Sequence, residues 1–316
     1  MTVQCAEHWQ PAGQSSNKAV IGAHMPFCAE EAALNSVNMG TVWDRATEFL
    51  GDNIGTVAPI ALAAIFVPAS INDAIAPLGS ANPDLQGWVN LASLVLVLVS
   101  IGGQLAIMAL ALDVSRTAGE AARAALGKLL WAAVIMILLL FGLMLALIPL
   151  GIFVVAAGLD ISGFATNDQA AITAAVAQLP AGVIWVTLAY LLAWAVGTIW
   201  LSARLTLAFP ALVGENLGLG AIGRSWTLTK GLVLKIIGVL LLYVIVSGVA
   251  ALAAKAAFGA VLGLIAGGAE PGSVASVLTS VAVGTVGTAF EVLQAAFIAK
   301  LFIAAHHGVQ EAAGSR

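Results

Sequence analysis

Glu291 is the one acidic residue deep in an apolar stretch of this sequence, and it is the first candidate for chemistry. A carboxylate is costly to bury in a membrane. Such acids therefore either pair with a cation or line a path for ions or protons. Both interpretations stay open for Glu291. Lys300 lies nine residues further on, about 180° around a helix, so it is expected to reach towards the headgroups from another face.

The sequence lacks the motifs of the common catalytic sites. It contains no HExxH, no GxSxG, no Walker loop and no cluster of Cys and His at metal-ligand spacing. His306 and His307 are adjacent near the end of the chain, where a solvated pair is expected rather than a metal site. We therefore expect a protein that is not an enzyme and needs no metal or other cofactor.

Small residues recur at every fourth position on the flank that leads to Glu291. They are Ser276, Ser280, Gly284 and Thr288. Small residues at this spacing let helices approach closely, so we favour packing over a pore lining.

The composition is that of an integral membrane protein. Of 316 residues, 61% are hydrophobic and only 9% are charged, whereas soluble domains carry about a quarter charged residues. Several apolar runs exceed the ~20 residues that a helix needs to cross the hydrocarbon core. The ~10-residue alternating segments of a membrane β-barrel do not occur. The sequence predicts an all-α polytopic membrane protein, and no nucleic-acid partner is expected.

Six spans are expected, and the basic residues between them predict the topology. The spans cover about Asn53–Ile71, Trp88–Leu112, Leu129–Ala157, Ala181–Phe209, Leu232–Phe258 and Val274–Ala305. Lys and Arg lie before the first span, after the second and fourth, and near the chain end. The connections after the first and third spans carry none. Both termini are therefore expected in the cytoplasm. The connection Leu159–Leu179 is expected to hold a short surface helix.

Residues 1–38 differ from the rest of the chain. They are polar, contain both cysteines, and include no apolar core of a signal peptide. They are either a disordered cytoplasmic tail or sequence upstream of a natural start at Met39. We favour the second, because organised sequence begins directly after Met39. The membrane domain is expected to cover 39–307, followed by a cytoplasmic tail, 308–316.

Three ten-residue segments align without gaps: VWDRATEFLG (Val42–Gly51), AGEAARAALG (Ala118–Gly127) and IGRSWTLTKG (Ile222–Gly231). Each ends in a glycine that permits a left-handed turn, and each precedes an odd-numbered span. The pattern predicts three interfacial elbow helices, each followed by two spans. Their apolar faces are expected at Val42, Ala46 and Phe49; at Ala118, Ala122 and Ala125; and at Ile222, Trp226 and Thr229.

Basic and aromatic residues on or beside these segments are candidates for binding anionic lipid headgroups or a protein partner. They are Trp43, Arg45, Arg123, Lys128, Arg224, Trp226 and Lys230. Trp226 is expected at headgroup level, and Arg224 and Lys230 are expected to face phosphates.

Arg204, Glu215 and Glu291 are the candidates for buried polar residues. Arg204 lies near the cytoplasmic end of the fourth span, and Glu291 about two-thirds of the way along the sixth. Both fall in the same half of the membrane, so an Arg204–Glu291 ion pair is expected. Lys235 is the alternative partner for Glu291, and Glu215 is the alternative for Arg204.

The stretch RLTLAFPALVGENLGLGAIGRSWTLTKG, Arg204–Gly231, is expected to leave the fourth span at a break at Pro210 and to re-enter apolar sequence through the third elbow. It resembles the pattern R-L-x-L-A-x-P-A-x-V-x-E-x-x-G-x-x-x-A-(L/I)-x-R-S-W-x-L-T-(R/K)-G. That pattern is typical of a bacterial family, the glycerophosphoryl diester phosphodiesterase membrane domain. Asn216 departs from it, because Gly is expected there.

The resemblance implies a six-span fold from about Met39 to His307 in a bacterial inner membrane. Some relatives join this domain to a soluble phosphodiesterase barrel. Fewer than a dozen residues follow the sixth span here, so no such barrel is expected in this chain. A phosphodiesterase or another membrane protein is a candidate partner, as is a second copy of the chain.

Two classes of function follow. The first is a non-catalytic inner-membrane protein that engages lipid headgroups or a protein partner at the cytoplasmic leaflet, in membrane or lipid homeostasis. The second is a transporter or channel with Glu291 in a polar path, although the paired broken helices that usually mark a substrate site are missing.

Overall fold

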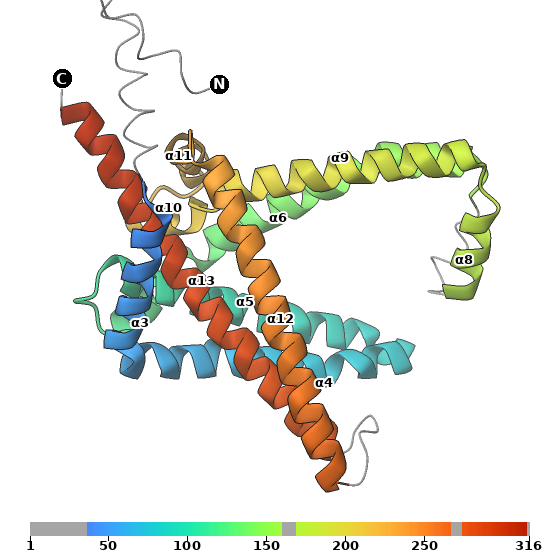
Figure 1. Ribbon diagram of the computed structural model, residues 1–316, viewed down its shortest axis with the longest axis horizontal. Coiled ribbons are helices and arrows are strands. Elements are labelled where there is room, and N and C mark those ends of the chain that lie inside the picture. The colour runs from blue at the N-terminus through green and yellow to red at the C-terminus, as the bar shows by residue number, and fades with distance from the viewer. Residues whose placement is uncertain (1–36, 160–168, 267–273, 315–316) are drawn as a thin grey trace, which may run out of the picture. The chain divides into compact units, whose positions relative to one another are not determined.

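The computed structural model describes residues 37–159, 169–266 and 274–314, and every regular element in this part of the chain is a helix (Figure 1). The expectations for residues 1–36 lie outside the described residues. The elements are α3 (Met39–Ala61), the π-helical turn η1 (Leu62–Phe66), α4 (Val67–Ala81), the 3-10 turn η2 (Pro83–Leu85), α5 (Gln86–Leu112), α6 (Ala118–Ala156), α8 (Gln169–Ala177), α9 (Ala181–Leu205), α10 (Ala208–Glu215), α11 (Gly220–Leu228), α12 (Val233–Ala266) and α13 (Val274–Gly314).

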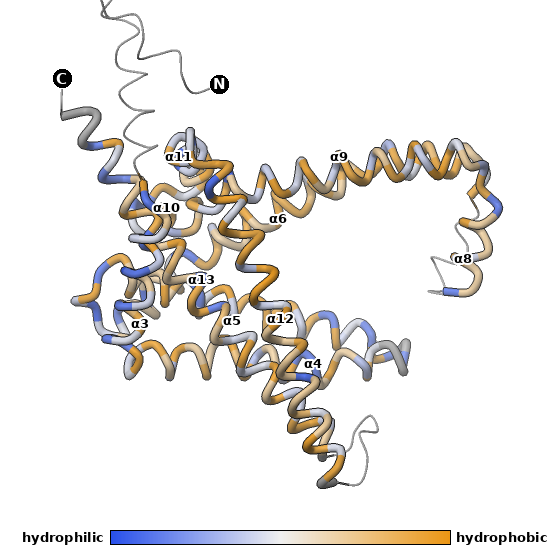
Figure 2. Tube along the Cα trace, viewed as in Figure 1, coloured by the Kyte–Doolittle hydropathy of each residue, from blue (hydrophilic) through white to orange (hydrophobic). Residues whose placement is uncertain are grey.

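Six helical segments are long and apolar enough to cross a membrane, and the prediction of six spans is confirmed. They are Met39–Gly79, Gln86–Leu112, Ala118–Ala156, Ala181–Glu215, Val233–Leu264 and Ala275–Gln310. Figure 2 shows their apolar character along most of their length. The shortest has 27 residues, more than the ~20 required. The chain is therefore a multi-pass membrane protein. The short helix expected in the third connection is also present, as α8.

The chain divides into two compact units. One consists of Met1–Ala132 with Arg204–Arg316, and the other of Ala133–Ala203. In the first unit α13 packs against α3, α5 and α12 (Figure 1), so most of the buried side chains gather around α13. In the second unit the Tyr190 hydroxyl donates to the Ala146 carbonyl, and the Trp194 indole donates to the Leu143 carbonyl at 3.3 Å. These two aromatic side chains connect the middle of α9 to the second half of α6.

The first elbow segment is present and ends at a kink. Asn53 has non-helical angles, φ −115° and ψ 16°, and its side-chain amide donates to the Phe49 carbonyl at 2.9 Å. The kink falls two residues after Gly51, so the predicted turn at that glycine is wrong. Asn is able to stabilise such a break, because its side chain bonds to the nearby main chain. The predicted face, Val42, Ala46 and Phe49, is buried.

The described part of the chain begins at Val37, two residues before Met39. The Asn38 side chain accepts a hydrogen bond from the Gly40 N–H at 2.9 Å and caps α3. Val37 is buried, and its carbonyl accepts from Lys235 Nζ at 3.4 Å. Residues 37 and 38 therefore belong structurally with α3.

The second elbow segment is not a separate helix. Gly127 lies inside the continuous helix α6, so the turn expected there is wrong. Alanine and leucine on both sides of Gly127 favour the helix strongly enough to carry it through one glycine. Of the expected face, Ala118, Ala122 and Ala125, only Ala125 is buried, and the other buried residue of this segment is Ala121.

A π-helical turn, Leu62–Phe66, interrupts the first span between Pro59 and Pro68. Pro68 has no N–H to offer the carbonyl four residues before it. The Val67 N–H reaches back five residues to the Leu62 carbonyl, which gives the wider π turn. The main chain thus shifts its register without leaving a helical path.

Gly103 on α5 lies directly against this π turn. A Cβ at Gly103 would lie 2.8 Å from the Ala64 Cβ and 3.2 Å from the Ala64 carbonyl carbon and oxygen. Real Cβ atoms do not approach that closely, so glycine is what allows α5 and η1 to meet here. This contact sets the depth of Gln104, the next residue on α5.

Gly103→Ala is expected to lower the free energy of unfolding by about 1–3 kcal/mol, because a methyl group must displace main-chain atoms of η1. Gly102→Ala is the matched control. Its Cβ would meet only Leu129 Cδ1 at 4.0 Å, and alanine is the better helix former. Thermal unfolding of both purified variants in detergent checks this. Equal melting temperatures for the two would contradict the close contact.

Candidate functional site

The family-like stretch Arg204–Gly231 forms a compact reversal between two spans. The break expected at Pro210 is instead at Thr206 and Leu207, between α9 and α10. Pro210 is the third residue of α10, in the first turn, where an N–H has no partner within the helix. Asn216 has φ 63°, a left-handed conformation in which Asn is the usual alternative to Gly. This explains how Asn can stand where the family pattern led us to expect glycine. Gly231, at φ 75°, turns the chain into α12.

The main-chain carbonyl of Arg204 is the anchor of this reversal. It accepts a hydrogen bond from the Ser225 hydroxyl at 2.7 Å, and the Thr229 hydroxyl, which donates to the Ser225 carbonyl at 2.8 Å, lies 3.4 Å from it. The Arg204 guanidinium donates to the Trp226 carbonyl at 3.3 Å and lies 5.2 Å from the centre of the Trp226 ring. One arginine therefore holds α11 through its main chain and its side chain together.

The buried face of α11 differs from the expected one. Ala221, Ser225, Leu228 and Thr229 are buried, whereas Ile222 is only partly covered and Trp226 is exposed at its edge. The Ser225 hydroxyl turns inward because it donates to the Arg204 carbonyl, and the Thr229 hydroxyl donates to the Ser225 carbonyl at 2.8 Å. A small face lets α11 approach closely. Of the predicted face, only Thr229 is fully buried.

Glu215 joins α10, α11 and α13. The Nε of Arg224 lies 3.0 Å and 2.9 Å from the two carboxylate oxygens of Glu215, and both side chains are less than a third exposed. The His306 Nδ1 lies 3.6 Å from the same carboxylate. This polar cluster directs Arg224 into the protein rather than towards a lipid phosphate. Glu215 was the alternative partner expected for Arg204, and that expectation is wrong, because Glu215 pairs with Arg224.

The Arg204–Glu291 ion pair expected from the sequence is wrong. Glu291, half-buried on α13, accepts a hydrogen bond from the Gln104 side chain on α5 at 3.3 Å. Its alternative partner Lys235 donates to the Val37 carbonyl instead. The pairing depends on how each helix is rotated about its axis, which the position of a residue along its span does not specify. In the described residues no group of His, Cys, Asp and Glu could hold a metal ion.

The small residues of α13 face α4. Ser276, Ser280 and Gly284 border a hollow of about 470 Å³, whose other wall includes Ser70 and Asp73 of α4. A Cβ on Gly284 would lie 3.3 Å from the Phe66 ring, so packing is tight at that end. The stripe thus packs closely at one end and borders an open hollow at the other.

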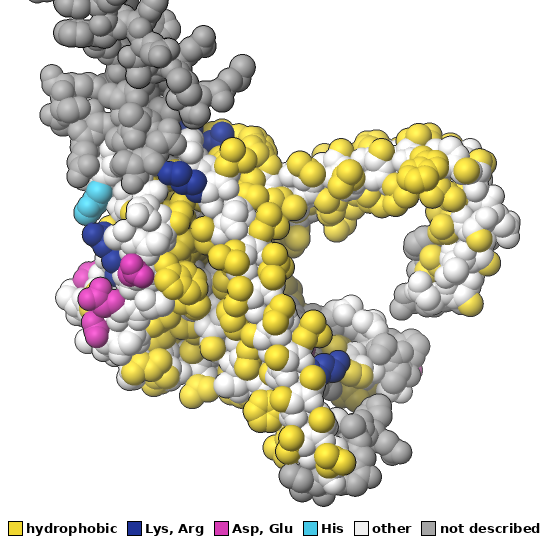
Figure 3. Space-filling model, viewed as in Figure 1, with side chains coloured by type: hydrophobic (Ala, Val, Ile, Leu, Met, Phe, Trp, Pro, Cys, Tyr) yellow, Lys and Arg dark blue, Asp and Glu magenta, His cyan; other side chains and the backbone are white. Residues whose placement is uncertain are grey.

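A second hollow of about 360 Å³ lies where α3 meets the last third of α13, and we call it the charged groove. It is lined by Arg45, Glu48, Phe49, Asp52, Asn53, Val114, Lys300 and Ile303. Figure 3 shows charged side chains gathered over α3 and the adjoining end of α13. Arg45 also borders a neighbouring hollow of about 300 Å³ that reaches Asn38 and His307.

The charged residues of this groove differ in whether they are bonded to other parts of the protein. Lys300 Nζ donates to the Ala111 carbonyl at 2.8 Å and lies 4.9 Å from the centre of the Phe49 ring. Arg45, Glu48 and Asp52 are exposed, and they make no direct hydrogen bond or ion pair to any residue that the structure describes. Three charged residues therefore line the groove without a hydrogen bond or ion pair to the described part of the chain.

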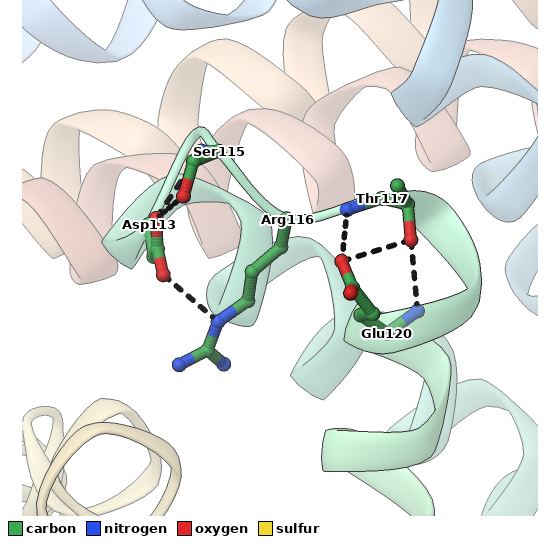
Figure 4. Close-up of polar contacts among 5 residues, drawn as sticks. All are labelled: Asp113, Ser115, Arg116, Thr117 and Glu120. Atoms are coloured by element: carbon green, nitrogen blue, oxygen red, sulfur yellow. Dashed lines mark hydrogen bonds and ion pairs between the residues drawn. The ribbon is translucent and has the colours of Figure 1, made fainter.

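A rigid turn between α5 and α6 supplies the groove wall at Val114 (Figure 4). The Glu120 carboxylate accepts from the Thr117 N–H and hydroxyl at 2.8 Å and 2.9 Å, and the Glu120 N–H donates to the Thr117 hydroxyl. This is a capping box at the start of α6. The turn keeps one wall of the groove in a fixed place.

Asp113 closes the other half of this turn. Hydrogen bonds from the hydroxyl and N–H of Ser115, and a smaller contribution from Arg116, hold the pKa of the Asp113 carboxyl below its ordinary value. Asp113 therefore stays ionised at neutral pH. Its stabilising effect is lost only as the pH falls through that lowered pKa.

The remaining candidates from the sequence lie apart from the groove or at its rim. Trp43 packs against Phe297 with ring centres 6.2 Å apart. Arg123 is exposed on α6, Lys128 is partly covered one turn further on, and Lys230 is exposed after α11. Of the predicted lipid-binding residues, only Arg45 lines the charged groove.

Sequence reasoning missed Glu48, Asp52 and Gln104, and it placed Lys300 only near the headgroups. It expected His306 to be solvated, whereas His306 lies 3.6 Å from the Glu215 carboxylate. The positions of Arg45, Glu48 and Asp52 at i, i+3 and i+7 could have indicated a charged stripe on α3. Nothing in the sequence signals the bond from Gln104 to Glu291, because the two lie 187 residues apart.

Comparison of the chain with protein-family models, with curated proteins and with solved structures finds no match. The resemblance carried by Arg204–Gly231 therefore stays a prediction.

Glu215→Gln and Arg224→Gln are each expected to lower the free energy of unfolding by about 1–3 kcal/mol, because each leaves a charged partner without its hydrogen bonds. The double variant is expected to lose less than the sum of the two. Arg123→Gln, which removes an exposed arginine from α6, is the matched control. Chemical or thermal unfolding in detergent measures all four. Additive losses would show that the pair contributes nothing.

Proposed function

We propose that this chain is a non-catalytic membrane protein that binds phospholipid headgroups in the charged groove, with a role in membrane or lipid homeostasis. The observation that carries the proposal is Arg45, which lines the groove and makes no hydrogen bond or ion pair to any residue that the structure describes. An arginine in this setting is a ready ligand for a phosphate, to which it offers paired N–H donors.

The position of the groove along the spans supports a lipid as its ligand. It lies beside the kink that separates the elbow part of α3 from its spanning part, and beside the end of α5. Exposed apolar side chains cover the spans on one side of it, and charged residues lie on the other. Headgroups occupy this boundary in a bilayer, and basic residues near it gain about 1 kcal/mol each from an anionic surface.

The orientation and the membrane are part of the proposal. The basic residues at this end of the spans favour the cytoplasmic leaflet, with both termini in the cytoplasm. The resemblance of Arg204–Gly231 favours a bacterial inner membrane. It also favours a phosphodiesterase or another membrane protein as a partner. In a Cys5→Ser/Cys28→Ser background, the cysteine of a Gly119→Cys variant is expected not to react with an impermeant thiol reagent added from outside the cell. Reaction would contradict this orientation.

Arg45→Gln is expected to weaken phospholipid binding about tenfold or more, because a charge-assisted contact to the phosphate is lost. The measurement is lipid titration of the purified protein in detergent, followed by native mass spectrometry. Lys255→Gln is the matched control, since Lys255 is an exposed cation on α12 that does not line the groove. Equal binding by the two variants would overturn the proposal.

A transporter or channel is the second candidate, and the Gln104–Glu291 pair in the interior is the observation that favours it. A half-buried carboxylate with one amide partner is able to exchange that bond for an ion or a proton. On this hypothesis Glu291→Gln keeps its fold and loses flux in proteoliposomes. If the pair is only structural, no flux above that of empty vesicles is measured with the unmodified protein.

A further inference from the structure

We propose that the charged groove selects a phospholipid whose headgroup joins a phosphate to a primary amine, rather than a purely anionic lipid. The inference rests on the proposed function and adds the class of headgroup. It follows from the charges that line the groove, which are two cations and two carboxylates.

The two cations provide the phosphate end of the site. Arg45 has all five N–H donors available, because it makes no direct bond to the described residues. Lys300 uses one of its three ammonium donors on the Ala111 carbonyl, which leaves two for a ligand. That bond and the contact with the Phe49 ring hold the Lys300 ammonium at the groove. A phosphate between these two side chains would accept charge-assisted hydrogen bonds from both.

The two carboxylates provide the amine end. Glu48 and Asp52 lie three and seven residues after Arg45, so all three project from one side of α3, within about 60° of one another. A net anionic headgroup entering the groove would meet two carboxylates that make no hydrogen bond or ion pair to a described residue, although the Lys300 ammonium attracts Glu48 electrostatically. A primary ammonium removes this repulsion and donates three hydrogen bonds. A trimethylated ammonium carries the same charge and has no N–H to donate.

The apolar part of the wall favours a lipid over a soluble phosphoamine. Phe49, Val114 and Ile303 line the same hollow and offer contacts to the glycerol backbone and the first acyl carbons. A volume of about 360 Å³ is at the small end of ligand sites, which suits a headgroup and excludes a whole lipid.

The test titrates the purified full chain in detergent with three phospholipids that share their acyl chains. These are a phosphatidylethanolamine, a phosphatidylcholine and a phosphatidylglycerol, with bound lipid counted by native mass spectrometry. The unmodified protein is expected to bind the ethanolamine lipid about tenfold more tightly than either of the others. Soluble glycerophosphoethanolamine, added as a competitor, is expected to displace little of it. Displacement at stoichiometric amounts would identify a soluble ligand and overturn the assignment to a lipid.

Two sets of variants separate this inference from the proposed function. Glu48→Gln combined with Asp52→Asn is expected to abolish the preference for the ethanolamine lipid and to raise binding of the glycerol lipid. Asp44→Asn, at an exposed acid on α3 outside the groove, is expected to change neither. Arg45→Gln is expected to weaken binding of all three lipids.

The outcomes are distinct. If Arg45→Gln weakens binding but the unmodified protein prefers the glycerol lipid, or the acid variants leave the preference intact, the headgroup assignment is overturned and the proposed function stands. If Arg45→Gln changes no binding, both fall. Melting temperatures of the variants, all at exposed side chains, check that each is folded.

Discussion

Main-chain hydrogen bonding governs where this chain is able to leave a helix. A bilayer offers no water to its core, so each carbonyl and N–H that a break releases must find a partner within the protein. At the π turn the Val67 N–H reaches the Leu62 carbonyl, and at the kink of α3 the Asn53 amide reaches the Phe49 carbonyl. At the end of α9 the Arg204 carbonyl accepts a hydrogen bond from the Ser225 hydroxyl, and the Thr229 hydroxyl lies 3.4 Å from it. Each departure from a straight helix is thus matched to a particular hydrogen bond.

This constraint gives the family-like motif a structural role. Arg204, Ser225, Trp226 and Thr229 close the reversal between two spans by hydrogen bonds among themselves. Glu215 and Arg224 then connect that reversal to α13 through His306. Lys300 lies less than two turns before His306 on the same helix, so the motif helps to fix the part of α13 that borders the charged groove. The stretch Arg204–Gly231, which the sequence predicts to bind lipid, therefore mainly holds two spans together. The charged residues without a direct bond to the described residues lie in the charged groove instead.

The two candidate functions depend on polar residues that differ in exposure and in bonding. Glu291 is half-buried and already bonded to Gln104, so a transport role requires that bond to open. Arg45, Glu48 and Asp52 are exposed and make no direct bond to the described residues, so a ligand can reach them without any rearrangement. Because binding to prepared groups needs no rearrangement, headgroup binding is the function that the geometry favours.

The sequence by itself determined the class of the protein, its six spans, the buried face of α3 and the short helix in the third connection. These follow from hydropathy and local periodicity, which each segment carries alone. It also located the reversal at Arg204–Gly231, although it placed the break three residues too late, since a proline in the first turn of α10 costs the helix little. The continuity of α6 through Gly127 was missed, because the helix propensity of the flanking residues outweighed one glycine.

Only the tertiary structure decided which polar groups meet. The partners of Glu291, Arg224 and Lys300 depend on the rotation of whole helices about their axes, and hydropathy does not specify that rotation. The buried face of α11 also depends on the tertiary structure. Its Ser225 and Thr229 hydroxyl groups lie against the carbonyl of Arg204, which is more than twenty residues earlier in the chain. The charged groove exists because α3, the turn after α5 and the end of α13 converge. No segment carries that site alone, so it could be found only once the three were brought together.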